Sequence, residues 1–375
     1  MRIDCYEDAR RAARRRLPRM VFDYIDGGAG GEVTLRANRE AFERVRFDPR
    51  WLTDVSERVT ATTVLGRPVS MPILLAPTGM SRLAHVRGEL DGARAAGAAG
   101  TIFCVSTSSA YPIEEIVAAG SGPIWFQLYL WRDDAEVRRL VERVGAAGCD
   151  ALVLTIDVPV VGNRERDLRN GAQLPPRITA RNVTDVARHP RWLAQFLRPP
   201  RVWYGSLPNG VRPSVGIGDP SATWERVDWL RGLWDGPLVV KGILSARDAR
   251  EAVRRGADAV YVSNHGGRQL DGSPASLDVL GEVVEAVGDR AEVLLDGGVR
   301  RGEDAVRARA LGARACAIGR PWVFALAAGG ARGVTRMLEL LRADVDRTLA
   351  LLGVPRIDDV DADVLRAAVV EKETA

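Results

Sequence analysis

Cysteine, histidine and any strong excess of charge are scarce in this sequence. Its 375 residues include four cysteines, none in a Cys-x-x-Cys pair, and three histidines. This pattern predicts neither a disulfide framework nor a metal site, and it is typical of cysteines that pack as small hydrophobic residues in a reducing compartment. Fifty-three basic against forty-nine acidic residues leave a net charge of +4. Such a balance argues against nucleic acid as a partner.

Segments that would send the chain into or across a membrane are also missing. No uninterrupted apolar run reaches the roughly 18–20 residues that span a bilayer, and the charged start is not followed by the apolar region of a secretory signal. The one basic run, residues 10–16, has alanines at helical spacing and no interleaved aromatic residues. It predicts a solvated helix face, with contact to anionic lipid as the alternative. We therefore expect a cytoplasmic globular protein.

From residue 71 onward, short apolar runs of β type alternate with longer amphipathic stretches, several of which end in glycine. This alternation is typical of βα units around a parallel sheet. The predicted strands are 71–77, 101–106, 123–129, 151–157, 237–242, 258–263, 292–297 and 313–319, and the predicted helices are 88–100, 113–120, 135–148, 223–234, 246–257 and 303–313. Eight units over about 260 residues predict an α/β fold, the (β/α)8 barrel.

The barrel, residues 71–330, is expected to be the main part of a single domain that spans residues 1–375. Residues 1–70 predict a helical extension ahead of it, and residues 331–375 predict helices after it. Between the fourth strand and the helix at 223–234 lie roughly 65 residues rich in Pro, Arg and Trp, far longer than an ordinary βα loop. This long loop, residues 158–222, is therefore expected to be functional or mobile.

Polar residues fall where the predicted strands end. In a barrel the βα loops at the carboxyl ends of the strands surround one cavity, and polar side chains there are costly to bury without a ligand or a partner. These residues are Ser106, Gln127, Tyr129, Thr155, Asp157, Lys241, His265, Arg268, Asp296, Gly319 and Arg320. Their placement predicts a large polar ligand.

The last two strands favour a phosphate group in that ligand. Residues 294–301 (LDGGVRRG) place two glycines beside Arg300, and residues 318–321 (IGRP) add another glycine-arginine pair. Backbone amides of glycines can approach an anion, arginine grips phosphate oxygens through paired donors, and barrels often bind phosphate after strands seven and eight. Lys241, at the end of an apolar strand, is either a cation beside a group that gains negative charge or half of a salt bridge across the barrel mouth.

His265 is the best candidate for an acid-base group. It follows a strand and precedes a Gly-Gly pair, whereas His189 lies in the long loop and His85 is expected either to cap the next helix or to line the mouth. A histidine exchanges protons near neutral pH, a carboxylate such as Asp157 could orient its ring, and Arg268 could hold a carboxylate substrate. The alternative is a structural histidine in a loop.

With these residues in place, the chain resembles the family of FMN-dependent α-hydroxy acid dehydrogenases and oxidases, which includes glycolate oxidase, lactate oxidase and mandelate dehydrogenase. The resemblance covers nearly the whole chain, and SNHGGRQLDG at 263–272 is its most specific motif. The other matching stretches are 76–80 (APTGM), 99–107 (AGTIFCVST), 125–131 (WFQLYLW), 154–167 (LTIDVPVVGNRERD), 239–249 (VVKGILSARDA), 294–305 (LLDGGVRRGEDA) and 318–322 (IGRPW).

The resemblance implies a role for each matching residue. The cofactor-binding residues would be Pro77, Thr78 and Gly79 by the flavin ring, Ser106, Gln127 and Thr155 at its edge, Lys241 and Ser263 near its reducible end, and Asp296, Gly298, Arg300, Gly319 and Arg320 along the ribityl and phosphate groups. Tyr24, Arg164 and Arg268 would bind the substrate carboxylate. Tyr129 would bind the substrate oxygen, and His265, supported by Asp157, would be the base. Asp271 is left as support for its loop.

The implied activity is oxidation of an L-2-hydroxy acid, such as lactate, mandelate or a bulkier acid, to the 2-oxo acid with FMN, and with quinone or oxygen as acceptor. Ser108 stands where glycolate oxidase has a tryptophan, and Gly79 where several oxidases have alanine, so a bulkier substrate could fit. The alternatives are an FMN oxidase that modifies a peptide in cofactor maturation and a flavin-binding barrel without turnover. The resemblance also implies a homotetramer, and residues 191–205 are either a peripheral anchor on the inner face of the membrane or an ordinary loop.

Overall fold

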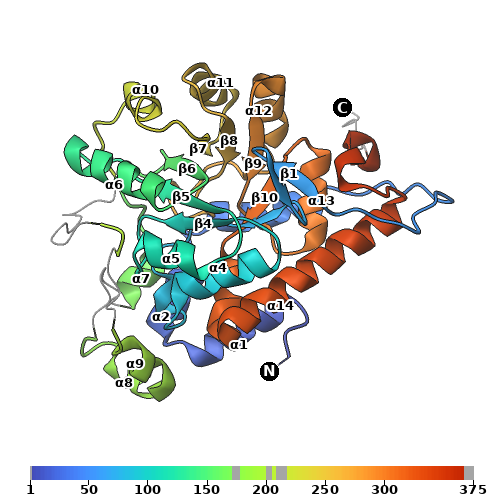
Figure 1. The fold of residues 1–375 in the computed structure, drawn as a ribbon. Coiled ribbons are helices and arrows are strands. Elements are labelled where there is room, and N and C mark those ends of the chain that lie inside the picture. The colour runs from blue at the N-terminus through green and yellow to red at the C-terminus, as the bar shows by residue number, and fades with distance from the viewer. Residues whose placement is uncertain (1, 171–177, 200–204, 208–217, 367–375) are drawn as a thin grey trace, which may run out of the picture.

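The computed structural model describes residues 2–170, 178–199, 205–207 and 218–366. Eight parallel strands close into a barrel in the order β10-β3-β4-β5-β6-β7-β8-β9, which confirms the predicted fold (Figure 1). Each predicted strand is present, and all are shorter than predicted except β7, which has the predicted length and is shifted by one residue. The strands are β3 (Ile73–Leu75), β4 (Phe103–Ser106), β5 (Ile124–Leu128), β6 (Ala151–Thr155), β7 (Leu238–Ile243), β8 (Ala259–Val262), β9 (Glu292–Leu295) and β10 (Ala315–Ile318).

Helices surround this barrel, and one of them was not predicted: α12, at Leu280–Val287, between β8 and β9. The predicted ones are α4 (Gly88–Ala98), α5 (Ile113–Ala119), α6 (Asp134–Ala146), α10 (Glu225–Arg231), α11 (Ala246–Arg254) and α13 (Gly302–Ala310). Ser245 and Asp133 cap α11 and α6 by accepting backbone N–H groups. The strands are almost continuous apolar runs because helices cover the outer face of the sheet while side chains fill the inside.

The amino end of the barrel is closed by a two-stranded hairpin, β1 (Thr62–Val64) and β2 (Arg67–Val69). Val64 and Val69 belong to the same buried cluster as the inward-facing side chains of the barrel, such as Trp125. Arg314, just before β10, donates to the carbonyl of Thr63 at 2.6 Å. The prediction of a helical extension over all of residues 1–70 was therefore wrong for residues 62–69, which form this hairpin.

The first part of the chain does form helices: α1 (Tyr6–Arg16), α2 (Arg19–Asp26) and α3 (Val33–Arg44). Helix α1 packs against α14 (Arg320–Leu352), which bends at Gly329 and Gly330 (Figure 1). Of the segment predicted to be helical, 331–375, residues 331–352 are thus the second half of α14, which begins just after β10. Residues 367–375 lie outside the described residues. After α14 only two short 3-10 turns, 357–359 and 362–364, follow among the described residues.

The long loop after β6 contains three short helices, α7 (Glu165–Arg169), α8 (Val183–Ala187) and α9 (Pro190–Phe196). Trp192 in α9 stacks on Phe196 at a centroid distance of 4.8 Å and donates to the carbonyl of Leu83 at 2.8 Å. In Figure 1, α8 and α9 stand apart from the barrel at its lower left edge. No helix in the described part of the chain is long and apolar enough to cross a membrane.

Candidate active site

The predicted site residues surround one cavity at the carboxyl ends of the barrel strands. Asp157 and Ser263 are the two that do not line it, and each lies directly behind a residue that does. The lining includes Tyr24, Pro77, Thr78, Gly79, Ser106, Gln127, Tyr129, Thr155, Arg164, Lys241, His265, Arg268, Asp296, Gly298, Arg300, Gly319 and Arg320. Residues from the N-terminal helices, from the barrel and from the loop after β6 therefore meet in one place.

His265 is held between a carboxylate and a phenol. Its Nδ1 lies 3.0 Å from Asp157 Oδ1, and its Nε2 lies 3.5 Å from the hydroxyl of Tyr129. Burial raises the pKa of Asp157, but the charge and hydrogen bond of His265, together with Lys241, outweigh burial and lower that pKa below its ordinary value. Asp157 is therefore an anion that orients the ring and favours a proton on Nδ1.

The backbone around His265 explains the glycines that follow it. His265, Gly266 and Gly267 have φ values of 58°, 64° and 75°, which places three successive residues in the left-handed region. Such a conformation is costly for a residue with a side chain and is held here by the hydrogen bond from the His265 N–H to Ser263 Oγ at 3.0 Å. The turn directs the imidazole into the cavity.

Two half-buried arginines, Arg164 and Arg268, line the cavity. Arg268 donates through one nitrogen to the carbonyls of Tyr24 and Gly27, at 2.6 and 2.8 Å, and its guanidinium lies 4.9 Å from the centre of the Tyr24 ring. Arg164 Nε is buried without a hydrogen-bond partner among the described residues. Burial, and then the charge of Arg164, lower the pKa of Arg268. Two cations this close with free donors form a site for an anion.

Lys241 occupies the centre of the cavity floor and is one of only two lysines in the chain. Its Nζ lies 3.1 Å from Asp296 Oδ2 and donates to Ser263 Oγ at 2.5 Å, while the hydroxyl of Ser263 donates to Asp296 Oδ1 at 2.6 Å. Tyr261 lies beneath, with its ring centre 5.0 Å from Nζ. The salt-bridge interpretation of Lys241 is therefore confirmed, and its place in the cavity lining leaves the other interpretation, a cation beside a group that gains negative charge, as a prediction.

Two unsatisfied polar atoms on the wall of the cavity call for a polar ligand. Gln127 Nε2 and Thr155 Oγ1 are buried and lack a hydrogen-bond partner within the described residues. Ser106 Oγ donates to Gln127 Oε1 at 3.1 Å, so the amide nitrogen of Gln127 faces the cavity. Buried polar groups are rarely left unpaired, and a heteroaromatic edge with alternating donors and acceptors would satisfy both atoms. The wall therefore fits the flavin edge that the resemblance implies.

The other end of the cavity suits a phosphate. Gly298 has a φ of 90°, and a Cβ there would lie 2.1 Å from the carbonyl oxygen of Asn38, so only glycine fits. Gly319 is the N-cap of α14 and lines the cavity together with Arg300, so the start of this helix lies at the cavity. The start of a helix beside a cation is favourable for an anion.

Arg320 has a further set of partners that the sequence did not indicate. Its three guanidinium nitrogens donate to the carbonyls of Ile25, Gly266 and Gly27, at 3.0, 3.0 and 2.8 Å. It lines the cavity, as predicted for a phosphate-binding residue, but it also ties the N-terminal helices to the His265 loop. Asp271 supports the same region, since it accepts the N–H of Thr34 at 2.9 Å, in agreement with its expected role in the loop.

Sequence reasoning missed several residues of the cavity, among them Tyr6, Leu35 and Met80. Tyr6 comes from α1 and lies 4.9 Å, ring centre to guanidinium carbon, from Arg300. No local motif marks a tyrosine nearly 300 positions before its partner, so only the fold reveals it. Of the other histidines, His85 accepts the N–H of Arg87 at the start of α4 and pairs with Asp91, and His189 begins α9; neither lines this cavity.

Comparison with known proteins agrees with this geometry. A sequence profile described as FMN-dependent dehydrogenase matches residues 13–367. A putative L-lactate dehydrogenase of Mycobacterium tuberculosis is 45% identical over 94% of this chain and 87% of its own length, and an L-lactate oxidase of Nostoc is 45% identical over 94% and 95%. The crystal structure of the monotopic membrane protein (S)-mandelate dehydrogenase superposes with a TM-score of 0.91 at 41% identity, covering 98% of this chain and 100% of the other.

Proposed function

The chain belongs to the FMN-dependent dehydrogenase family and oxidises an L-2-hydroxy acid to the 2-oxo acid with FMN, and on that premise we propose that His265 is the base of this reaction. The observation that supports this assignment is the position of the His265 ring. Nδ1 is held by the Asp157 anion, and Nε2 faces Tyr129 inside the cavity that Arg164 and Arg268 also line. A proton leaving the substrate, from the α-carbon or from its hydroxyl, would be received at Nε2.

The substrate carboxylate would lie between the two arginines, because they are the half-buried cations with free donors at the mouth. Arg268 retains nitrogens that are not used on the carbonyls of Tyr24 and Gly27, and Arg164 Nε has no partner in the described part of the chain. Tyr24, stacked under Arg268, would donate its hydroxyl to the same carboxylate. Tyr129 would bind the oxygen on the α-carbon beside His265.

FMN, when bound, accepts the electron pair that leaves the α-carbon. Gln127, Thr155 and Ser106 would hold the ring edge through the polar atoms described above, and Gly298, Arg300 and the start of α14 would hold the phosphate. Lys241 would place its charge where negative charge develops on reduction. Ser263 and Asp296 would keep Nζ in that position.

Anaerobic mixing of the FMN-loaded protein with L-lactate and with L-mandelate tests the assignment. The absorbance of oxidised flavin should bleach in the wild type. The His265→Asn protein should also bind FMN and be yellow, but its absorbance should persist after mixing. If His265→Asn were reduced as fast as the wild type, the base would lie elsewhere. If no hydroxy acid bleached the wild type, the activity itself would be wrong, and a peptide substrate would be the next to try.

The substrate side of the cavity favours an acid larger than glycolate. Ser108 lines it with a small side chain and Gly79 with none, and Val161 forms part of the wall. Replacing Ser108 with Trp should exclude L-mandelate by steric overlap while L-lactate still reduces FMN. Equal loss for both acids would instead indicate damage to the flavin site.

The acceptor is proposed to be a quinone. Reduced enzyme should be reoxidised faster by a soluble quinone than by air, and rapid peroxide formation in air would identify an oxidase.

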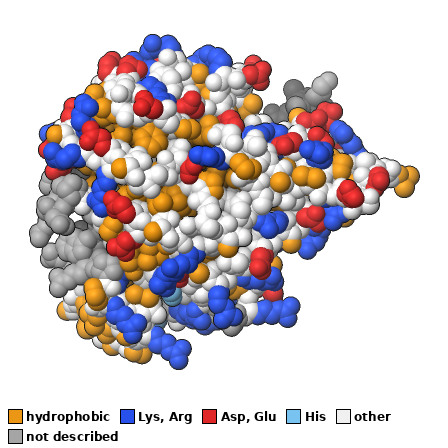
Figure 2. All heavy atoms as spheres, in the orientation of Figure 1, with side chains coloured by type: hydrophobic (Ala, Val, Ile, Leu, Met, Phe, Trp, Pro, Cys, Tyr) orange, Lys and Arg blue, Asp and Glu red, His pale blue; other side chains and the backbone are white. Residues whose placement is uncertain are grey.

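We further propose that the surface of α8 and α9 contacts the membrane. Leu197, Val183 and Ile178 are 69, 46 and 40% exposed. Arg188 and Arg191, in the same stretch of the chain, are also exposed, and Figure 2 shows hydrophobic and basic side chains together on the surface over α8 and α9. Exposed apolar side chains among arginines favour an anionic lipid surface. The protein should co-sediment with phosphatidylglycerol vesicles and not with phosphatidylcholine vesicles, and Leu197→Asp should abolish this. The part of the predicted anchor at 200–204 lies outside the described residues.

The expected homotetramer would be tested by light scattering.

A further inference from the structure

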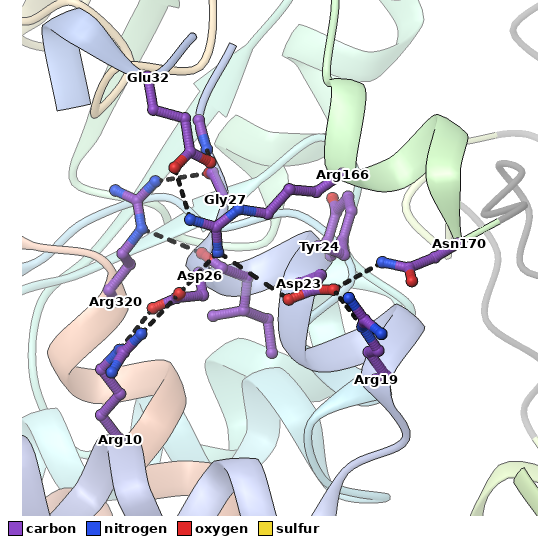
Figure 3. Close-up of polar contacts among 12 residues, drawn as sticks. Arg10, Arg19, Asp23, Tyr24, Asp26, Gly27, Glu32, Arg166, Asn170 and Arg320 are labelled. Carbon is purple, nitrogen blue, oxygen red and sulfur yellow. Dashed lines mark hydrogen bonds and ion pairs between the residues drawn. The ribbon is translucent and has the colours of Figure 1, made fainter. Parts of the chain in front are cut away.

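Arg166 joins the two segments that carry Tyr24 and Arg164. Its guanidinium donates through one nitrogen to Asp26 Oδ2 at 2.9 Å and through another to Glu32 Oε2 at 2.5 Å. Asp26 ends α2, the helix of Tyr24, and Arg166 lies in the first turn of α7, two residues after Arg164. Figure 3 shows the guanidinium inserted between these carboxylates, close to Tyr24. One side chain therefore connects two groups that face the cavity from different parts of the chain.

The carboxylates around Arg166 are poorly exposed and share it as a cationic partner, although Asp26 also pairs with Arg10. The side chains of Asp23, Asp26 and Glu32 are 13, 8 and 16% exposed. Arg166 Nη1 also lies 3.9 Å from Asp23 Oδ1. Burial raises the pKa of Asp26, but Arg10 and then Arg166 lower it below its ordinary value, so this carboxyl is an anion. Without Arg166, anions on α2 and at the start of α3 would repel one another across the same gap.

The opposite side of the α2 end is fixed by other arginines. The carbonyls of Tyr24 and Gly27 accept hydrogen bonds from Arg268. Those of Ile25 and Gly27 accept from Arg320, which Figure 3 shows beside the end of α2. These contacts hold α2 to the barrel side of the cavity. Arg166 is the contact that holds it to α7, together with the donation from Asn170 Nδ2 to Asp23 Oδ2 at 2.6 Å.

We propose that Arg166 is a positioning residue for substrate recognition: by joining α2 to α7 it sets the spacing between Tyr24 and Arg164, and thereby the affinity for the substrate carboxylate. This inference rests on the proposed function, in which these two residues and Arg268 bind that carboxylate. Arg166 itself does not line the cavity. Its effect is therefore on binding, and the rate of the chemical step at His265 should change little.

The geometry calls for arginine and not for lysine. A planar guanidinium can donate in two directions at once, to Asp26 and to Glu32. The lysine side chain is shorter and ends in a single ammonium nitrogen. Replacement by lysine should keep the charge and lose one of the two contacts. Replacement by methionine should keep most of the stem and lose both.

The test compares Arg166→Met and Arg166→Lys with Arg169→Met. Arg169 is on the same helix, is 72% exposed and pairs only with Glu165 one turn away, so it controls for loss of a positive charge on α7. For each FMN-loaded protein, two quantities are measured under anaerobic conditions: the L-lactate concentration that gives half the limiting rate of flavin reduction, and the limiting rate itself. The dissociation constant of oxalate, a dicarboxylate that is not oxidised, is measured from the flavin absorbance change.

In Arg166→Met the half-saturating concentration and the oxalate dissociation constant should both rise about tenfold, the effect of roughly one interaction on binding. In Arg166→Lys they should rise about threefold. Arg169→Met should match the wild type, and the limiting rate should stay within about threefold in every variant. Methyl lactate, which has no carboxylate, should reduce the wild type and Arg166→Met at similar half-saturating concentrations.

Three outcomes would overturn the inference. The first is that Arg166→Met binds oxalate as tightly as Arg169→Met does. The second is that the half-saturating concentrations of methyl lactate and of lactate rise equally in Arg166→Met. The third is that the limiting rate falls while the affinity for oxalate is unchanged. Should Arg166→Met be recovered without FMN, the lysine variant decides by the same measurements. If wild-type protein bound oxalate but no hydroxy acid reduced it, the proposed function would fail, while the oxalate series would still test the role of Arg166.

Discussion

His265 Nδ1 lies 3.0 Å from Asp157 Oδ1, and Asp157 does not itself line the cavity. The carboxylate therefore acts on the substrate only through the imidazole. In the proposed reaction it would fix the ring so that Nε2 points toward the reacting atoms, and it would stabilise the positive charge that His265 gains on accepting a proton. A carboxylate behind a histidine is an arrangement that serves a general base.

Asp157→Asn tests this relationship. An amide has nearly the same shape but no charge, so the ring keeps a hydrogen bond and loses electrostatic support. The limiting rate of flavin reduction should fall by about 10²- to 10⁴-fold, the range for one acid-base group. Rapid-mixing absorbance measurements with L-lactate give this rate, and bound FMN and oxalate affinity serve as controls. A rate within about threefold of the wild type would show that the anion is not needed.

The pH dependence of stability should report the same anion. The pKa of Asp157 in the folded protein is below its ordinary value of 3.8. A carboxyl whose folded pKa is depressed stabilises the fold above the unfolded pKa, and that contribution is lost as pH falls through the folded pKa. The difference in unfolding free energy between wild type and Asp157→Asn should be constant above about pH 5 and shrink below pH 3.8. Urea titrations at several pH values would measure it, and a difference that grows on acidification would contradict the sign.

Lys241→Met should lower the midpoint potential of bound FMN. Reduction adds negative charge beside Nζ, and removing that cation destabilises the reduced form. A decrease of about 30 mV or more, equivalent to about 1.4 kcal/mol for two electrons, is expected from spectroelectrochemical titration. Because Asp296 loses its partner in this variant, Lys241→Met with Asp296→Asn is the control that removes the stranded charge. An unchanged potential in both would place the cation away from the ring.

Gly298→Ala should release FMN. A residue with a side chain is strained at φ 90°, and the new Cβ would meet the Asn38 carbonyl oxygen at 2.1 Å, so the loop that faces the phosphate must move. The expected cost is about 2 kcal/mol or more in unfolding free energy, with a lower FMN content after purification. Gly281→Ala is the matched control: it lies in α12 with nothing within 4 Å, and alanine there should stabilise by about 0.5–1 kcal/mol. Equal FMN content in both variants would mean that the loop is not part of the cofactor site.

The barrel could be predicted because its determinants are local. Each strand is a short apolar run near a polar or glycine residue. This pattern located the cavity as well, since Lys241 lies toward the end of β7 and His265 lies in the loop after β8. The hairpin β1–β2 was not predicted because a three-residue strand is too short to show the alternation of apolar and polar residues. Its apolar residues, Val64 and Val69, look like ordinary loop residues until the open barrel end is known.

Contacts between distant segments could not be predicted from the sequence. Tyr6 lies against Arg300, and Arg166 lies between Asp26 and Glu32, through side chains that no spacing rule relates. The chain has many arginines and carboxylates, so composition alone allows a large number of pairings. Only the placement of α1, α2 and α7 around the cavity selects these. Residues that touch the ligand were thus easier to predict than residues that hold them in position.

Gly79→Ala should slow flavin reduction through one identifiable contact. A Cβ at position 79 would lie 2.9 Å from Ser108 Cβ, closer than two carbon atoms approach without strain, so either the segment beside the proposed flavin site or the Ser108 loop must shift. We expect reduction by L-mandelate to slow about tenfold, the effect of 1.4 kcal/mol on a barrier, which lies within the range for overpacking. Ser108→Gly alone should stay near the wild type, and in the double variant it should restore the rate to within about threefold, because the clashing carbon is gone. Stopped-flow rates of all four proteins close this cycle. Additive losses in the double variant would show that Gly79 acts through its backbone at the flavin and not through Ser108.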